Sequence, residues 1–147
     1  MNHAATTTEA PASADQQLVY ALLGAAHMLE DRVEQRLAPV GLSASKLSVL
    51  TQLVQAGEPL ALSELAARLS CVRSNMTQLV DRLEADGLVR RVDDPADRRS
   101  VLAEVTAAGQ SRQQSGAAEL AAVRAEFLAP LAEPHRTALL QALAELA

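Results

Sequence analysis

Aromatic residues and cysteine are nearly missing from this 147-residue sequence, which has one Tyr, one Phe, one Cys and no Trp. Alanine and leucine must therefore supply the core, and both favour helices. A single cysteine excludes an internal disulfide framework and is typical of a reducing cytoplasm. Hydrophobic residues make up 49% of the chain and charged residues 21%, which predicts one globular, mainly α-helical domain.

Long apolar runs are also missing. No stretch approaches the ~20 residues that cross a bilayer. Residues 1–15 have neither the basic start nor the apolar centre of a secretory signal. We therefore expect a cytoplasmic protein without membrane contact, and we expect residues 1–15, which are rich in Ala, Thr, Ser and Pro, to form a flexible tail.

Signatures of enzymes and metal sites are missing too. The sequence has no glycine-rich phosphate loop, no nucleophile elbow and no paired histidines. His27 and His135 have no second ligand at metal-binding spacing, so we expect no metal and no cofactor. Nothing supports a catalytic pair of Cys71 and His27, and we predict that the protein is not an enzyme. For Cys71 we expect a small buried hydrophobe, the alternative being a thiol activated near a helix N-terminus.

Positive charge is concentrated in one segment, although the net charge is −5. Residues 68–99 contain seven of the 13 Lys and Arg residues, together with six acids. The segment is thus close to neutral as a whole. It can bind nucleic acid only if the fold separates the two signs of charge onto different faces.

Apolar residues recur at helical spacing in most of the chain. A long first helix is expected to start near residue 16 and to end before Pro39. Ser43 fits the N-cap of a second helix, which Gly57 stops. A short third helix over 62–69 is followed, after a turn of about three residues, by a fourth that ends at Gly87.

Two strands and two further helices complete the prediction. The runs 88–93 and 101–105 favour strands, and the polar segment 94–100 joins them into a hairpin. Thr106 can cap a long fifth helix, and Pro134 suits the first turn of a sixth. The predicted fold class is mainly α with a small β-hairpin.

The third and fourth helices form a minimal helix-turn-helix unit, and the hairpin after them makes it winged. Met76, Leu79, Val80 and Leu83 share the apolar face of the fourth helix, so its opposite face is polar. Asn and Gln can pair with adenine in the major groove, and Ser and Thr can reach bases or phosphates. The alternative to a DNA-reading helix is an ordinary helix whose polar face is simply solvated.

The hairpin tip carries two arginines beside an acid. Exposed arginines on a narrow protrusion suit the negative potential of the minor groove, and Asp97 can orient one guanidinium. The alternative is a turn selected only for solubility. The candidate DNA-binding residues are Arg73, Ser74, Asn75, Thr77, Gln78, Arg82, Asp97, Arg98 and Arg99.

The first, fifth and sixth helices carry leucine faces that are too extensive for so small a middle region. A two-fold dimer would cover them, whereas the alternative is a monomeric bundle in which they pack on one another. A second alternative concerns function. A helical dimer of this kind can serve as a protein-interaction module that does not bind DNA.

Three segments resemble the MarR family of bacterial winged helix-turn-helix regulators: LSELAARL at 62–69, LSCVRSNMTQLVDRLEADGL at 69–88 and DDPADRRSVLAEVTAAG at 93–109. The resemblance covers roughly residues 16–146. It implies a homodimer on double-stranded DNA with a pseudo-palindromic operator, a repressor, and relief by a small phenolic or anionic effector. It matches Arg99 to the minor-groove arginine and Asp97 to the acid that orients it.

The same resemblance implies a division of the chain. We expect a DNA-binding lobe over 43–106, flanked by dimerisation helices over 16–40 and 107–147. Effectors would bind between these parts, where His27, Met28, Lys46 and Leu50 are candidates. His27 and Lys46 can meet an anion, although both can equally be plain surface residues.

Two positions depart from the family pattern. Ala61 and Val72 stand where the family has a Ser or Thr cap, and the loss of such a cap typically costs ~0.5–2 kcal/mol. Ser70 can cap the fourth helix from further back. Val72 also lacks the hydroxyl that would touch phosphate at this position.

Overall fold

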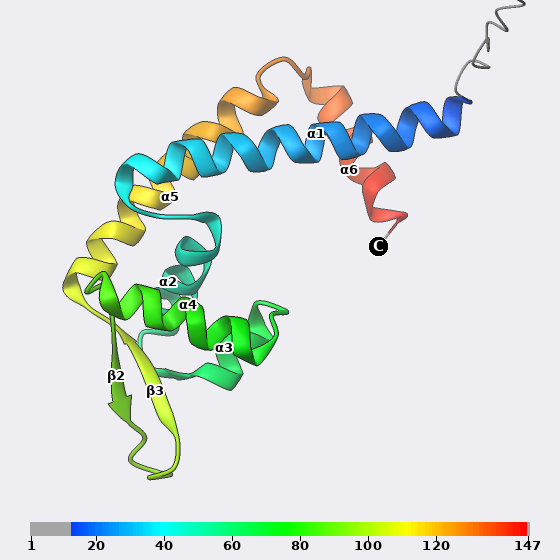
Figure 1. The fold of residues 1–147 in the computed structure, drawn as a ribbon. Coiled ribbons are helices and arrows are strands. Elements are labelled where there is room, and N and C mark those ends of the chain that lie inside the picture. The colour runs from blue at the N-terminus through cyan, green and yellow to red at the C-terminus, as the bar shows by residue number, and fades with distance from the viewer. Residues whose placement is uncertain (1–12, 147) are drawn as a thin grey trace, which may run out of the picture.

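A computed structural model describes residues 13–146 and confirms the mainly α fold with a hairpin (Figure 1). The elements, in chain order, are α1 Ala14–Leu37, the 3-10 helix η1 Ala38–Val40, α2 Ala44–Ala56, β1 Leu60–Ala61, α3 Leu62–Arg68, α4 Arg73–Ala85, β2 Val89–Asp93, β3 Val101–Val105, α5 Ala107–Leu128 and α6 Glu133–Ala144. Among these residues no single helix is long and apolar enough to span a membrane. One consecutive helix pair, 14–40 with 44–56, meets the length and composition criteria together but is bent by 72°.

Side-chain caps set the beginnings of three helices. Ser13 and Gln16 form a capping box at α1, so the helix begins inside the segment predicted as a tail, whose residues 1–12 lie outside the described part. Ser43 accepts a hydrogen bond from the Lys46 N–H at 3.2 Å at the start of α2. Thr106 accepts one from the Gly109 N–H at 3.0 Å at the start of α5. The predicted caps at Ser43 and Thr106 are confirmed.

The turn between α3 and α4 is closed by the backbone. Neither Ala61 nor Val72 makes a side-chain cap, and Ser70 does not replace one. Ser70 instead takes a left-handed conformation with φ of 49°. The N–H of Cys71 then reaches the carbonyl of Ala66 at 2.9 Å, which closes the end of α3.

The hairpin belongs to a three-stranded antiparallel sheet, in the order β1-β3-β2. Val89 pairs with Val105 and Asp93 with Val101, as expected for the predicted hairpin. The two-residue strand β1 was not predicted; it adds Leu60 and Ala61 to the other edge of β3. This edge strand ties the hairpin to the segment between α2 and α3.

The core lies within the lobe formed by α2, α3, α4 and the sheet. Leu50, Leu53, Leu65, Met76, Val80 and Leu83 are almost completely buried. Leu79, predicted on the apolar face of α4, is half-buried at the edge of this core. The start of α5 packs tightly, since a Cβ built on Gly109 would lie 2.0 Å from the Leu88 carbonyl oxygen.

α1 and α5 extend from the lobe side by side (Figure 1). Arg36 joins them, with contacts of 2.5 Å to Glu126 and 3.3 Å to Glu119. The hydrogen bonds that Arg36 donates to these carboxylates, Glu126 foremost, raise the pKa of Arg36 above its ordinary value. The long helices are thus held together by charge as well as by apolar contact.

The far ends of these helices and all of α6 leave apolar side chains uncovered. α6 has no buried residue. A helix of this length is marginal in water by itself. The exposed large apolar residues of this region are Leu18, Val19, Tyr20, Leu23, Met28, Leu128, Leu139, Leu140, Leu143 and Leu146.

Candidate nucleic-acid interface

The predicted α4 residues share one exposed surface. Met76, Val80 and Leu83 turn the opposite face of α4 into the core. The residues left outside are those predicted to contact DNA: Arg73, Ser74, Asn75, Thr77, Gln78 and Arg82. The Thr77 hydroxyl donates to the Arg73 carbonyl at 3.1 Å. The hydroxyl proton of Thr77 is therefore engaged within the helix.

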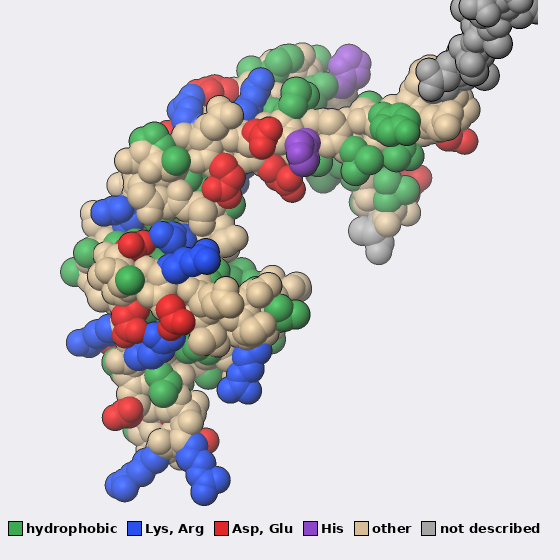
Figure 2. All heavy atoms as spheres, viewed as in Figure 1, with side chains coloured by type: hydrophobic (Ala, Val, Ile, Leu, Met, Phe, Trp, Pro, Cys, Tyr) green, Lys and Arg blue, Asp and Glu red, His purple; other side chains and the backbone are tan. Residues whose placement is uncertain are grey.

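Asp97, Arg98 and Arg99 lie exposed at the tip of the hairpin, where Figure 2 shows blue side chains projecting from the molecule. The expected contact of Asp97 with a guanidinium is not the one observed. Asp97 Oδ1 instead accepts the backbone N–H of Arg99 at 2.9 Å. An acid two residues before an N–H favours this local turn, so Asp97 orders the backbone that carries Arg99.

The fold separates the charges of residues 68–99. Arg68 pairs with Glu64 at 2.6 Å, and Arg90 pairs with Glu104. Arg91 forms ion pairs with both Asp81 and Glu84, and Lys46 pairs with Asp86 at 2.6 Å. The arginines of this segment that make no ion pair with any residue of 13–146 are Arg73, Arg82, Arg98 and Arg99.

These unpaired arginines all belong to the predicted site. Two lie on α4 and two at the hairpin tip, so both parts of the candidate interface keep positive charge available for an anionic partner. The acids on α4 and at its C-terminal end, Asp81, Glu84 and Asp86, form ion pairs with Arg91 and Lys46. The α4 surface is therefore locally basic on a chain whose net charge is −5, whereas the tip arginines share the hairpin with three acids that form no ion pair among residues 13–146.

The proposed effector residues are not brought together. Leu50 is completely buried in the core. Lys46 is occupied by Asp86, while His27 and Met28 are exposed on α1. The His27 side chain is 82% exposed, and Glu30 lies 3.9 Å away.

A different group of residues lines an open hollow of about 250 Å³ between α1, α2 and α5. None of the lining residues is charged, and Ser48, Thr51 and Gln52 supply its polar atoms. The lining residues are Val33, Ala44, Leu47, Ser48, Thr51, Gln52, Leu69 and Leu120. The hollow suits a small, mostly apolar molecule with a hydrogen-bonding group.

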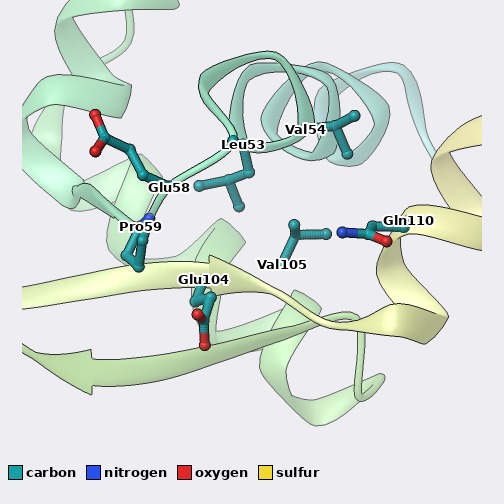
Figure 3. Close-up of a pocket in the computed structure, with 8 residues that line it drawn as sticks. Leu53, Val54, Glu58, Pro59, Glu104, Val105 and Gln110 are labelled. Carbon is teal, nitrogen blue, oxygen red and sulfur yellow. The ribbon is translucent and has the colours of Figure 1, made fainter.

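A second hollow, of about 130 Å³, lies between the end of α2 and β3 (Figure 3). Leu53, Val105 and Gln110 are among its lining residues, and Glu58 and Glu104 supply acids. It contains no predicted site residue. Within residues 13–146 no group of three His, Cys, Asp or Glu side chains could hold a metal ion.

Cys71 is half-buried in the turn before α4, against the lobe core. Its Sγ lies 3.5 Å from the Val72 carbonyl oxygen. Cys71 is thus only half-buried, whereas the sequence predicted a buried side chain, and its role as a small hydrophobe stays a prediction.

A short helix behind an exposed polar helix, followed directly by an arginine-tipped hairpin, defines a winged helix-turn-helix protein. The MarR family model matches residues 42–101. YdgJ, an uncharacterized HTH-type transcriptional regulator of Bacillus subtilis, is 29% identical over 134 residues, which are 91% of this chain and 79% of YdgJ. Matches to several other curated relatives span about half of their length.

Solved structures agree with this class. AbsC, a MarR family transcriptional regulator from Streptomyces coelicolor, superimposes with a TM-score of 0.80 at 25% identity, over 94% of this chain and 95% of AbsC. A mutant of MarR from E. coli, solved in complex with operator DNA, shares the fold, with a TM-score of 0.77 at 21% identity over 88% of this chain and 93% of MarR. The chain therefore resembles MarR family regulators in sequence and in fold, as the sequence motifs indicated.

Proposed function

We propose that this protein is a transcription regulator that binds a pseudo-palindromic operator as a homodimer and acts as a repressor. The observation that carries the proposal is the sorting of charge in the lobe. Every arginine of residues 68–99 that lacks an ion pair within the described chain lies on α4 or at the hairpin tip. A DNA-binding member of the family, E. coli MarR, supports the proposal by its fold.

The two parts of the surface have different roles in the proposal. Asn75 and Gln78, exposed on α4, offer amides that can pair with adenine in the major groove. Arg98 and Arg99 are carried by the hairpin to the minor groove, where narrow width and negative potential attract arginine. Arg73 and Arg82 lie at opposite ends of the polar face and neutralise phosphates.

Dimerisation is the second element of the proposal. The uncovered leucines of α1, α5 and α6 form an apolar surface outside the lobe, which a two-fold copy of the chain would cover. Two α4 helices would then meet successive major grooves, with half-sites about 10 bp apart or at a multiple of that spacing. A monomer at micromolar concentration in light scattering would contradict this element.

The effector is the third element. The uncharged hollow between α1, α2 and α5 contacts both the long helices and the lobe. Its hydroxyls and amide suit a phenolic ligand better than an anion. A ligand there can act only by favouring one spacing of the lobes, so ligand and operator must weaken each other by the same factor. Equal ligand affinity with and without operator would exclude this mechanism for that ligand.

The decisive experiment is selection of DNA from a random pool by the purified protein. We expect enrichment of a two-fold symmetric sequence, and an affinity for it that falls steeply with salt because bound arginines release counterions. A protein-interaction module would enrich no sequence. That result would overturn the proposed function.

A further inference from the structure

One arginine connects the two DNA-facing parts of the lobe. Arg91 on β2 donates from Nη2 to Asp81 and from Nη1 to Glu84, and its backbone N–H donates to Glu84 Oε1 at 3.1 Å. Both carboxylates belong to α4 and lie about one helical turn apart. β2 leads directly into the tip that carries Arg98 and Arg99.

Arg91 differs from its neighbour Arg90 in direction and exposure. Successive side chains of a strand point to opposite faces, so Arg91 faces α4 while Arg90 pairs with Glu104 on β3. The Arg91 side chain is 27% exposed and that of Arg90 66%. The hydrogen bond from Arg91 to Asp81 raises the pKa of Arg91, although burial acts in the opposite direction.

A further attachment of the hairpin lies at the other edge of the sheet. β1 holds β3 through the pairs Leu60 with Ala103 and Ala61 with Leu102. Among residues 13–146, no side chain of segment 92–100 makes a hydrogen bond or ion pair with α4. Arg91 thus supplies the polar side-chain contacts between the hairpin and α4, in addition to the packing of Val89 and Ala103 in the shared core.

We propose that Arg91 is a positioning residue for DNA binding, which sets the angle of the hairpin to α4 so that both reach adjacent grooves of one duplex together. The inference rests on the proposed function. Arg91 is occupied by α4 carboxylates and does not itself neutralise a phosphate. Lysine cannot replace it, because a point charge lacks the planar fork that holds two carboxylates at once.

A double-mutant cycle tests this role. Arg91 and the tip residue Arg99 belong to different groups of contacts, and substitutions at distant, independent sites have additive effects. We expect Arg99→Ala to weaken binding of the pool-selected DNA in the parent. In an Arg91→Gln background the hairpin is no longer held at its angle to α4. The fold-loss of DNA affinity caused by Arg99→Ala should then be at least about threefold smaller than in the parent.

Arg90→Gln is the matched control. It removes the same charge from the same strand and breaks an ion pair within the sheet, but it leaves the contact with α4 intact. In this background, Arg99→Ala should weaken DNA binding by the same factor as in the parent. An equal reduction in the Arg90→Gln and Arg91→Gln backgrounds would mean that charge alone matters, and would overturn the inference.

Two further backgrounds separate geometry from charge and from folding. Arg91→Lys keeps the charge and should nevertheless reduce the effect of Arg99→Ala. Asp81→Asn with Glu84→Gln keeps Arg91 but removes its partners, and should do the same even if Arg91→Gln does not fold. If Arg99→Ala weakens DNA binding in either background by the same factor as in the parent, the positioning role is overturned. This holds even if the loss of two acids raises the overall affinity for DNA.

The outcomes for the two proposals are distinguishable in this experiment. A parent protein that binds no DNA overturns the proposed function. A parent that binds DNA, with the same loss from Arg99→Ala in every background, overturns only the role of Arg91.

Discussion

The unpaired arginines allow the salt dependence of DNA binding to be predicted from the structure. Arg73, Arg82, Arg98 and Arg99 have no ion-pair partner among residues 13–146, so a dimer offers eight such side chains. If each neutralises one phosphate, the slope of log K against log salt reaches about −7. Arg99→Ala removes two of the eight side chains and should flatten the slope by about 1.8. Between about 50 and 200 mM salt, the variant should therefore lose roughly twelvefold less affinity than the parent does.

Fluorescence anisotropy with selected and scrambled DNA at several salt concentrations measures this change. Arg99→Ala should lower affinity for both DNAs, whereas Gln78→Ala should keep the slope and lose roughly 1–3 kcal/mol of discrimination at one base pair in each half-site. Arg90→Ala is the charge-matched control, since Arg90 is already paired with Glu104. A parental slope for Arg99→Ala, or an equal flattening by Arg90→Ala, would refute the reasoning.

Three smaller predictions concern the lobe and its core. Val72→Ser supplies the missing cap of α4 and should stabilise the protein by roughly 0.5–2 kcal/mol; an unchanged urea midpoint would contradict it. Gly109→Ala should destabilise by roughly 1–3 kcal/mol through overpacking against the Leu88 carbonyl, whereas Gly24→Ala, with nothing within 4 Å, is the control that should not destabilise in thermal melts. Cys71→Ser should keep DNA binding and effector response, because the chain has no second cysteine to resolve a sulfenic acid; release of DNA by peroxide from the parent alone would argue otherwise.

Local rules predicted most of the elements because they act within a few residues. The caps at Ser43 and Thr106, the helix stops at glycine and the alternation in the hairpin are all readable within one or two turns of chain. The missing caps at Ala61 and Val72 were indicated by the resemblance to the family pattern, and the replacement cap expected from Ser70 is not formed. Local rules did not predict β1, since a two-residue strand has no period of its own and forms only because β3 offers a free edge.

The sequence predicted which face of the fourth helix is exposed, but not which site residues pair with one another. Helical periodicity placed Asn75 and Gln78 outside and Met76 inside, as the structure has them. Pairing across space was not predictable. Asp97 binds the backbone of Arg99, and Lys46, proposed for an anion, is occupied by Asp86, 40 residues away in sequence. Strand alternation does place Arg91 on the same face as the buried Val89, and this signal could have identified the arginine that faces α4.

The uncovered leucines of α6 permit a test of the proposed dimer in which protein folding and association are separated. Leu140 is 71% exposed and Leu143 42% exposed in the protomer, so replacing both by Asn removes far less contact within one chain than replacing a core leucine would. In a two-fold dimer each replacement counts twice, and burying one leucine contributes roughly 1.5–3 kcal/mol. The dimer dissociation constant should therefore rise by at least about a hundredfold, as measured by sedimentation of the variant at several concentrations. Val101→Asn, an exposed apolar position on β3 that is 42% exposed, is the control and should stay dimeric. If the Leu140→Asn/Leu143→Asn protein sediments like the parent at every concentration, α6 does not form the dimer interface.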